Sequence, residues 1–332
     1  MRASGFLLAL TVVLSGCATG AYYAQAIEGH AALMAIARPV DEVIGDAATP
    51  PALRAQLVLA GSIRNFASRA LKLPDNGSYR SYAALDRKYA VWNVVAAPEF
   101  SVEAVQSCFP VAGCVSYRGF FVQDAAETHA AAQRAKGLDV HVTGVPAYST
   151  LGWFDDPLLS TFIDYRNTQL ARLIFHELAH QVVYVEDDST FNESFAVVVE
   201  EEGVRRWLAS TGREGALDGF LAAQARLRGF VALIDDARTR LERLYAEPIA
   251  VDAMRARKRI EFVALATRYA QLTARWGGFS GYDRFMAAPN NALLASIATY
   301  TQRVPELRRL FVESGGDFDV FYARVRALAA SR

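Results

Sequence analysis

The sequence has 332 residues, of which 52% are hydrophobic and 21% charged, and its 35 Lys and Arg balance its 35 Asp and Glu. This composition excludes an intrinsically disordered chain, a collagen-like repeat and a small disulfide-stapled protein. Balanced charge without a basic run also argues against nucleic-acid binding. The composition favours catalysis or the binding of a small partner, with a large buried core.

The first 16 residues predict a lipoprotein signal peptide that does not belong to the fold. Arg2 precedes an apolar run too short to span a bilayer, and Leu14-Ser15-Gly16-Cys17 follows directly. This segment resembles a bacterial lipobox, which implies cleavage before Cys17 and lipidation of that residue; Ala18 resembles the signal for the outer membrane. We therefore expect a periplasm-facing lipoprotein of the outer membrane. An ordinary signal peptide with an incidental cysteine is the alternative.

Two further cysteines, Cys108 and Cys114, lie six positions apart. An even pair in an exported protein predicts one short-loop disulfide, because the compartment is oxidising. A metal site is the alternative, but two cysteines at this spacing supply too few ligands.

The mature chain divides into three expected regions. Residues 17–75 form an N-terminal helical segment that ends at the turn Pro74-Asp75-Asn76-Gly77. Residues 76–210 form a core with β-rich runs and three helices. Residues 211–332 form a helical C-terminal region with a hairpin seam. Within the core, strands are expected near 89–95, 114–122 and 140–145, with a helix over 124–136 and an edge strand beside the substrate cleft.

The chemistry is concentrated in His176-Glu177-Leu178-Ala179-His180, an H-E-x-x-H pattern inside an apolar helical run. Residues four apart lie on one helix face, so both imidazoles can bind one Zn²⁺. Glu177 points elsewhere and can act as a general base on a metal-activated water. The alternative is that both histidines are buried in the core and hydrogen-bonded to their neighbours, but burying such polar groups without a metal is costly.

A catalytic zinc needs a third protein ligand, and Glu193 is the candidate. Residues 185–189 read as a turn, and a helix over 191–208 would return and bring Glu193 to the metal. Alternatively, Thr190-Phe191-Asn192-Glu193 reads as a capping box in which Glu193 only bonds the backbone. Glu200 is the reserve ligand. Val197 supplies no acidic partner one turn after Glu193, so the group that orients the histidines is not evident.

His176-Glu177-Leu178-Ala179-His180-Gln181, followed by Asn192-Glu193-Ser194-Phe195-Ala196, resembles the gluzincin metallopeptidases. The whole mature chain resembles a proteobacterial family of lipoproteins named as predicted zinc aminopeptidases, which shares the segments 74–79, 109–114 and 152–157. The resemblance implies His176, His180 and Glu193 as zinc ligands and Glu177 as the catalytic base. It implies an α+β, mostly helical fold with a zincin-like catalytic core, a small sheet and a helical C-terminal region.

The expected function is zinc-dependent hydrolysis of peptide substrates by an aminopeptidase. A zinc endopeptidase of the cell envelope and a catalytically silent zinc-binding lipoprotein are the alternatives. The large aminopeptidases carry a longer ligand spacing and a G-x-M-E-N segment that this chain lacks. Four tyrosines are candidate oxyanion donors: Tyr117, Tyr148, Tyr282 and Tyr300. Three carboxylates are candidate binders of a substrate amine: Glu99, Asp155 and Asp156.

Overall fold

The structure is a computed structural model that describes residue 20 and residues 22–109, 113–298 and 303–331. The expected signal peptide, Cys17 and Tyr300 lie outside these residues. The described chain is mostly helical with three small sheets, as the α+β prediction requires. Among the described residues, no helix combines the length and apolarity that crossing a membrane requires.

The N-terminal region is helical, as predicted, but it also contains a short strand. Residues 22–35 form a first helix, and the next elements are β1 (Arg38–Pro39), α2 (Val40–Gly45) and α3 (Pro51–Leu71). Pro51 occupies the first turn of α3, where its missing N–H costs no hydrogen bond. The strand β1 was not predicted, because two residues carry no periodicity and their pairing partners lie more than forty positions away.

The predicted strands and the helix between them are present. The central sheet has the order β6-β3-β7, and all its pairs are antiparallel. The run near 114–122 is divided into two short strands. A second small sheet has the order β1-β2-β8, and β4 and β5 form a hairpin. The elements of this region are β2 (Ser81–Ala83), β3 (Val91–Ala97), β4 (Ser107–Phe109), β5 (Gly113–Val115), β6 (Arg118–Phe120), α4 (Gln123–Arg134), β7 (Asp139–Val145) and β8 (Leu158–Leu159).

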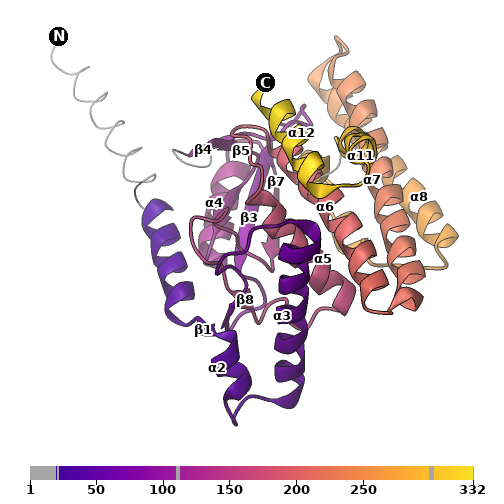
Figure 1. Cartoon of the computed structure of the whole chain (residues 1–332). Helices are drawn as coiled ribbons and strands as arrows, with labels where there is room; N and C mark the ends of the chain where they lie inside the picture. The colour runs from indigo at the N-terminus through magenta and orange to yellow at the C-terminus, as the bar shows by residue number, and fades with distance from the viewer. Residues whose placement is uncertain (1–19, 21, 110–112, 299–302, 332) are drawn as a thin grey trace.

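Helices make up most of the rest of the described chain. The two that carry the candidate site residues are α5 (Asn167–His180) and α6 (Ser189–Ser210), which pack against each other. In Figure 1, α7 and α8 lie side by side at one edge of the molecule, and the helix of residues 22–35 lies at the opposite edge. The later helices are α7 (Leu217–Tyr245), α8 (Val251–Arg275), α9 (Asp283–Met286), α10 (Asn291–Ala298), α11 (Val304–Glu313) and α12 (Phe318–Ala330).

The largest group of buried apolar residues draws on all three regions that the sequence suggested. It joins Leu57 and Ile63 of α3 with Leu170 and Phe195 of the α5–α6 pair and with Phe321 of α12. These five side chains are completely buried. The C-terminal helix therefore packs on the same core as the N-terminal helices, and this core holds the α5–α6 pair from several sides.

The two candidates for the edge strand, 140–145 and 114–122, supply both edges of the central sheet, as β7 and β6. The helix of residues 22–35 lies along β6. Phe121, directly after β6, donates its N–H to Gln25 at 3.2 Å, and the Tyr22 ring contacts Phe120. A side chain of this helix thus occupies a donor that strand addition would use.

Candidate metal centre

The helix α5 presents His176 and His180 on one face because its opposite face is embedded in the core. Leu170, Ile174 and Leu178 recur at four-residue spacing and are completely buried. The two imidazole rings have centroids 4.8 Å apart, and their Nε2 atoms are separated by 3.2 Å. The apolar stripe thus fixes the direction in which both histidines point.

The helix α6 brings the Glu193 carboxylate to the same point. Its Oε2 lies 3.2 Å from Nε2 of His176, and its Oε1 lies 3.7 Å from Nε2 of His180. Asp188, not Thr190, caps α6 by accepting the N–H of Phe191 at 2.9 Å. The capping-box interpretation is therefore wrong, and Glu193 does not serve as a capping residue.

The turn between α5 and α6 is itself fixed by a buried amide. Asn192 accepts the N–H of Val185 and donates to its carbonyl, both at 2.8 Å. Only 2% of Asn192 is exposed. This double hydrogen bond fixes the conformation of the turn before α6 and therefore the position of Glu193 relative to the two histidines.

The three groups converge closely enough to hold one metal ion. The two Nε2 atoms are 3.2 Å apart, and the two oxygens of Glu193 lie 3.2 Å and 3.7 Å from one histidine each. With one ligand atom taken from each residue, all three atoms lie within 4.8 Å of one another, and ligands about 2.0 to 2.1 Å from a tetrahedral zinc lie about 3.3 Å apart. Oε2 of Glu193 is buried without a hydrogen-bond partner among the described residues. In that part of the chain, His176, His180 and Glu193 form the group of His, Cys, Asp or Glu whose ligand atoms converge closely enough to hold a metal ion.

The electrostatics of His180 and Glu193 agree with a site built for a cation. Burial lowers the pKa of His176, but its contacts with Glu193 and Glu200 outweigh burial and raise that pKa well above its usual value. Burial lowers the pKa of His180 to about 4, so this imidazole is neutral at physiological pH and keeps a lone pair. Burial opposes ionisation of Glu193, but the two histidines outweigh it and lower the pKa of that carboxyl. The neutral imidazole and the ionised carboxylate are the ligand forms that zinc requires.

Glu200 supports His176 from behind. It is 1% exposed, and its Oε2 lies 2.9 Å from Nδ1 of His176 while its Oε1 accepts from Nε of Arg172 at 2.6 Å. Burial raises the pKa of Glu200, but Arg172 and His176 outweigh burial and lower it. Glu200 is therefore not among the converging ligand atoms. It fixes the ring so that Nε2 faces the other two ligands.

The carboxylate that orients His176 was expected one turn after Glu193, where Val197 stands. It belongs instead to Glu200, seven residues after Glu193. Helical periodicity alone could have found it, since residues seven apart share a face. The same spacing led us to expect Glu200 as a reserve metal ligand, whereas in the structure it orients His176.

Glu177 occupies a neighbouring face of α5, beside a second buried carboxylate. Burial raises the pKa of Glu177 to about 7, and a hydrogen bond from Ser149 counteracts part of this effect. Asp156 is completely buried and accepts the N–H and hydroxyl of Thr150 at 2.8 and 2.9 Å. Burial raises the pKa of Asp156 to about 6. A carboxylate with a pKa near neutrality can accept and return a proton.

The structure separates the candidate oxyanion donors. The charges of Glu193 and Glu177 both contribute to the raised pKa of Tyr117, after burial, which places Tyr117 beside the site. Tyr282 instead stacks on Phe230 at 4.3 Å, within the α7–α8 region. Tyr148 packs against Phe121 with ring centroids 4.9 Å apart. Tyr117 is therefore the described candidate whose hydroxyl senses the charges of Glu193 and Glu177 most directly.

The candidate amine binders are mostly occupied. Glu99 forms an ion pair with Arg255 of α8 at 2.7 Å. Asp156 is buried against Thr150, and the Asp155 carboxylate lies so close to Gly77 that a side chain there would collide with it. Glu99 and Asp156 are therefore engaged by other groups, whereas Asp155 is exposed and stays a candidate for binding a substrate amine.

A disulfide joins Cys108 to Cys114 across the β4–β5 hairpin. The hairpin touches the turn between α5 and α6, because Cys114 donates its N–H to the Asp187 carboxylate. Asp187 has a φ of 64°, a conformation that Asp tolerates better than most residues. The hairpin thus braces the turn that joins the two helices of the site.

Fold and site together define a helical protein with two histidines and a glutamate arranged as one metal ion requires, and with a further glutamate beside them. The sequence profile of the Aminopep family, described as “putative aminopeptidase”, matches residues 21–332. The chain belongs to this family. No curated protein and no solved structure matches it significantly.

Proposed function

We propose that this protein is a zinc-dependent peptidase that cleaves peptide bonds, and specifically an aminopeptidase. The observation that carries the proposal is the convergence of His176, His180 and Glu193, whose ligand atoms lie within 4.8 Å of one another, with Glu177 beside them. The family supports peptidase activity. A purely structural zinc usually has four protein ligands and needs no base, whereas a site with three ligands leaves a position for water.

His176, His180 and Glu193 would hold the ion, and zinc bound there would acidify a water and polarise the scissile carbonyl. Glu177 accepts the proton of the attacking water and passes it to the nitrogen of the leaving amine. Tyr117 donates a hydrogen bond to the carbonyl oxygen as negative charge develops on it. Glu200 keeps the His176 ring in its orientation throughout.

The substitution Glu177→Gln tests this mechanism. It keeps the shape of the side chain and removes the proton acceptor, so we expect zinc content to be unchanged and turnover to fall by about 10²- to 10⁴-fold. The matched control is Glu242→Gln, an exposed α7 carboxylate, which should leave both unchanged. Full activity in Glu177→Gln would remove the proposed mechanism. A zinc-loaded wild-type protein that hydrolyses no peptide would instead favour the catalytically silent alternative.

The aminopeptidase assignment rests on the family and needs its own test. One peptide is offered with a free and with an acetylated amino terminus, and the rates of first-bond cleavage are compared. An aminopeptidase recognises the free amine and should cleave only the first form. Equal cleavage of both forms would make the protein an endopeptidase and would leave the zinc mechanism intact.

We further propose that the protein is a lipoprotein anchored through Cys17 and facing the periplasm, in the outer membrane. The lipobox-like Leu14-Ser15-Gly16-Cys17 supports the anchor. The Cys108–Cys114 disulfide is in keeping with an oxidising compartment. The variant Cys17→Ser should be released from membranes on fractionation. If it stays bound like the wild type, the anchor proposal is wrong.

A further inference from the structure

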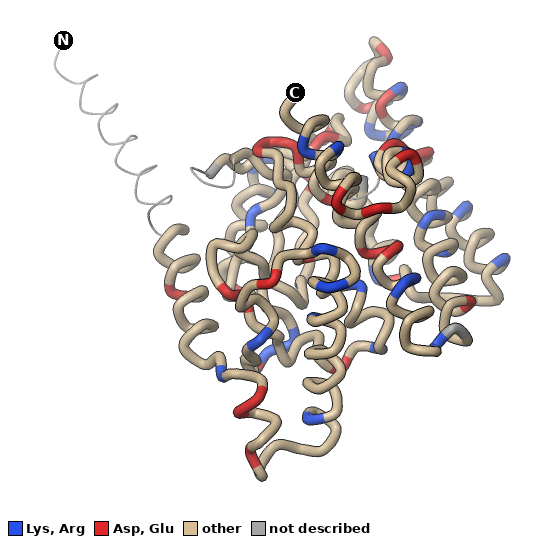
Figure 2. Tube along the Cα trace, in the orientation of Figure 1, with Lys and Arg blue, Asp and Glu red and all other residues tan. Residues whose placement is uncertain are grey.

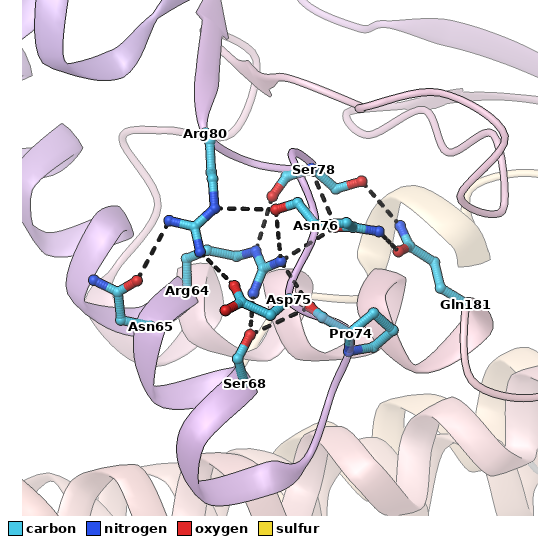
Figure 3. Close-up of polar contacts among 9 residues, drawn as sticks. All are labelled: Arg64, Asn65, Ser68, Pro74, Asp75, Asn76, Ser78, Arg80 and Gln181. Carbon is cyan, nitrogen blue, oxygen red and sulfur yellow. Dashed lines mark hydrogen bonds and ion pairs between the residues drawn. The ribbon is translucent and has the colours of Figure 1, made fainter.

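Residues 74–78, between α3 and β2, are held in place by a buried arginine that the proposed mechanism does not use. Arg64 is completely buried. Its guanidinium donates to the carbonyl oxygens of Ser78 at 2.8 Å and Pro74 at 2.7 Å, and to the backbone and side-chain oxygens of Asn76 at 3.2 Å (Figure 3). Because a guanidinium presents its donors in one rigid plane, these acceptors cannot move independently of one another.

The same segment holds the side chain of Gln181, the residue directly after His180. Arg64 can only donate, so the Asn76 amide turns its oxygen to Arg64 and its nitrogen to Gln181. Asn76 donates to Oε1 of Gln181 at 2.8 Å, and Nε2 of Gln181 donates to the hydroxyl of Ser78 at 3.2 Å (Figure 3). Both ends of the Gln181 amide are therefore bonded to one rigid segment.

The two histidines of the candidate metal centre are held in different ways. Nδ1 of His176 lies 2.9 Å from Oε2 of Glu200. Nδ1 of His180 is buried, and no described residue forms a hydrogen bond with it. A metal-binding imidazole is ordinarily oriented through its second ring nitrogen. Since His180 lacks that support within the described chain, its position depends on the backbone that carries it.

The backbone that carries His180 is the end of a helix. α5 ends at His180, and Gln181 is its C-cap. The last carbonyl groups of a helix have no partner within the helix, and helix ends fray for this reason. Because the Gln181 side chain is bonded to residues 74–78, the end of α5 is fixed at the point where His180 stands.

We propose that Gln181 is a positioning residue whose two side-chain hydrogen bonds to residues 74–78 fix the end of α5 and thereby direct Nε2 of His180 toward the metal. The inference rests on the proposed function, because it assumes the zinc that the three ligands would hold. Both ends of the Gln181 amide are engaged, so Gln181 acts through His180 and not on the substrate. Each histidine then has its own support, a carboxylate for His176 and a fixed backbone for His180.

The substitution Gln181→Met keeps the length of the side chain and removes both hydrogen bonds. We expect zinc to bind about tenfold more weakly, with one zinc per chain at saturation, because a displaced His180 is a poorer ligand. Competition with a chelator measures this at a temperature where the metal-free protein is folded. Unchanged affinity would overturn the proposal.

Ser78→Ala tests whether the effect passes through Gln181. It removes one of the two hydrogen bonds and should weaken zinc binding less than Gln181→Met does. The double variant should bind zinc as Gln181→Met alone does, since both changes break the same contact. A further loss of affinity in the double variant would overturn the proposal, because Ser78 would then act on the site by another route.

The matched control is Asn290→Leu. Asn290 is also a half-buried amide that uses both ends, since it donates to the carbonyl of Val140 at 3.0 Å and accepts the N–H of Leu293 at 2.9 Å. Asn290→Leu and Gln181→Met each lose two hydrogen bonds and should lower the melting temperature to a similar extent. Only Gln181→Met should weaken zinc binding. Equal losses of zinc affinity in both variants would show a general effect of lower stability and would overturn the proposal.

Amide hydrogen exchange of the metal-free protein separates this proposal from the proposed function, because it needs neither zinc nor substrate. Gln181→Met should speed exchange of residues 179–182 about fivefold, whereas Asn290→Leu should not. Unchanged exchange at the end of α5 would overturn the positioning role. If exchange and zinc affinity both change as expected but the wild type hydrolyses no peptide, the proposed function fails and the positioning role stands.

Discussion

The α5–α6 and α7–α8 pairs are both built from helices that are consecutive in the chain and pack together, but they place their charged residues in opposite ways. In α7–α8, an apolar seam that includes Ile234 and Leu241 is buried and the ion pairs lie outside. The Arg240–Asp236 pair, for example, leaves nearly half of each side chain exposed. Figure 2 shows positive and negative residues mixed along both helices. This pair is stabilised mainly by apolar packing, with a long ion pair between the helices, from Arg268 to Asp236 at 3.8 Å.

In α5–α6 the polar groups point inward. Glu200 is 1% exposed, His180 is 6% exposed, and the Glu193 side chain is 19% exposed. Burying carboxylates and imidazoles inside a helix pair is costly unless they bind one another or a metal. The two helix pairs thus differ in where their charged residues lie, and the site is marked by charged residues that are buried between helices and not by how many charged residues the helices carry.

The largest effect should come from removing a ligand from the inward cluster. His180→Ala, and separately Glu193→Ala, should lose zinc and all detectable turnover, because two remaining ligands do not hold the ion tightly. Metal analysis of the purified variants after dialysis checks this. Full zinc occupancy in Glu193→Ala would break the comparison, since the buried carboxylate would then have another purpose.

The pH dependence of stability should reveal the cost of the buried Asp156. The pKa of this group is about 6 in the folded protein and 3.8 when unperturbed, so the folded state holds its proton more tightly. The stability that this group contributes is present below pH 3.8 and is lost as the pH rises through 6. Relative to Asp156→Asn, the wild type should lose about 2 to 3 kcal/mol of unfolding free energy between pH 4 and pH 7. Urea unfolding of both proteins across this range measures the difference, and parallel curves would contradict it.

Glu200→Gln should weaken zinc binding by about 10- to 100-fold and leave one zinc per chain at saturation. The amide can still accept from one neighbour, but it lacks the charge that holds both His176 and Arg172. Competition with a chelator of known affinity measures the change. An unchanged affinity would mean that packing alone orients the His176 ring.

The smallest effect should come from the outward charges of α7–α8. Asp236→Asn breaks the exposed pair with Arg240 and should change the free energy of unfolding by no more than about 1 kcal/mol, with zinc affinity unchanged. Chemical denaturation beside the chelator assay checks both values. A loss of zinc here would show that the two helix pairs are not independent.

Sequence alone predicted the elements and residues that follow from local periodicity. The H-E-x-x-H spacing placed His176, Glu177 and His180 on one helix, and the apolar pattern of the next helix brought Glu193 back to them. Helix and strand ranges such as α4 and β7 were close for the same reason. These predictions needed only a repeat along the chain.

Features that depend on contacts between distant segments were missed. β1 and β8 are two residues each and exist only through pairing with β2. Asp188 caps α6 although Thr190 fits the local capping pattern equally well. In each case the local sequence is compatible with more than one conformation, and contacts with distant segments determine which one forms.

The most direct test of the account is a zinc titration of the metal-free protein, with hydrolysis of a peptide that has a free amino terminus as the signal. The account predicts no activity without metal, a rise proportional to added zinc, and a plateau at one zinc per chain, since His176, His180 and Glu193 converge on one point. Activity that is already complete in the metal-free protein, or that never appears at any zinc concentration, would contradict it.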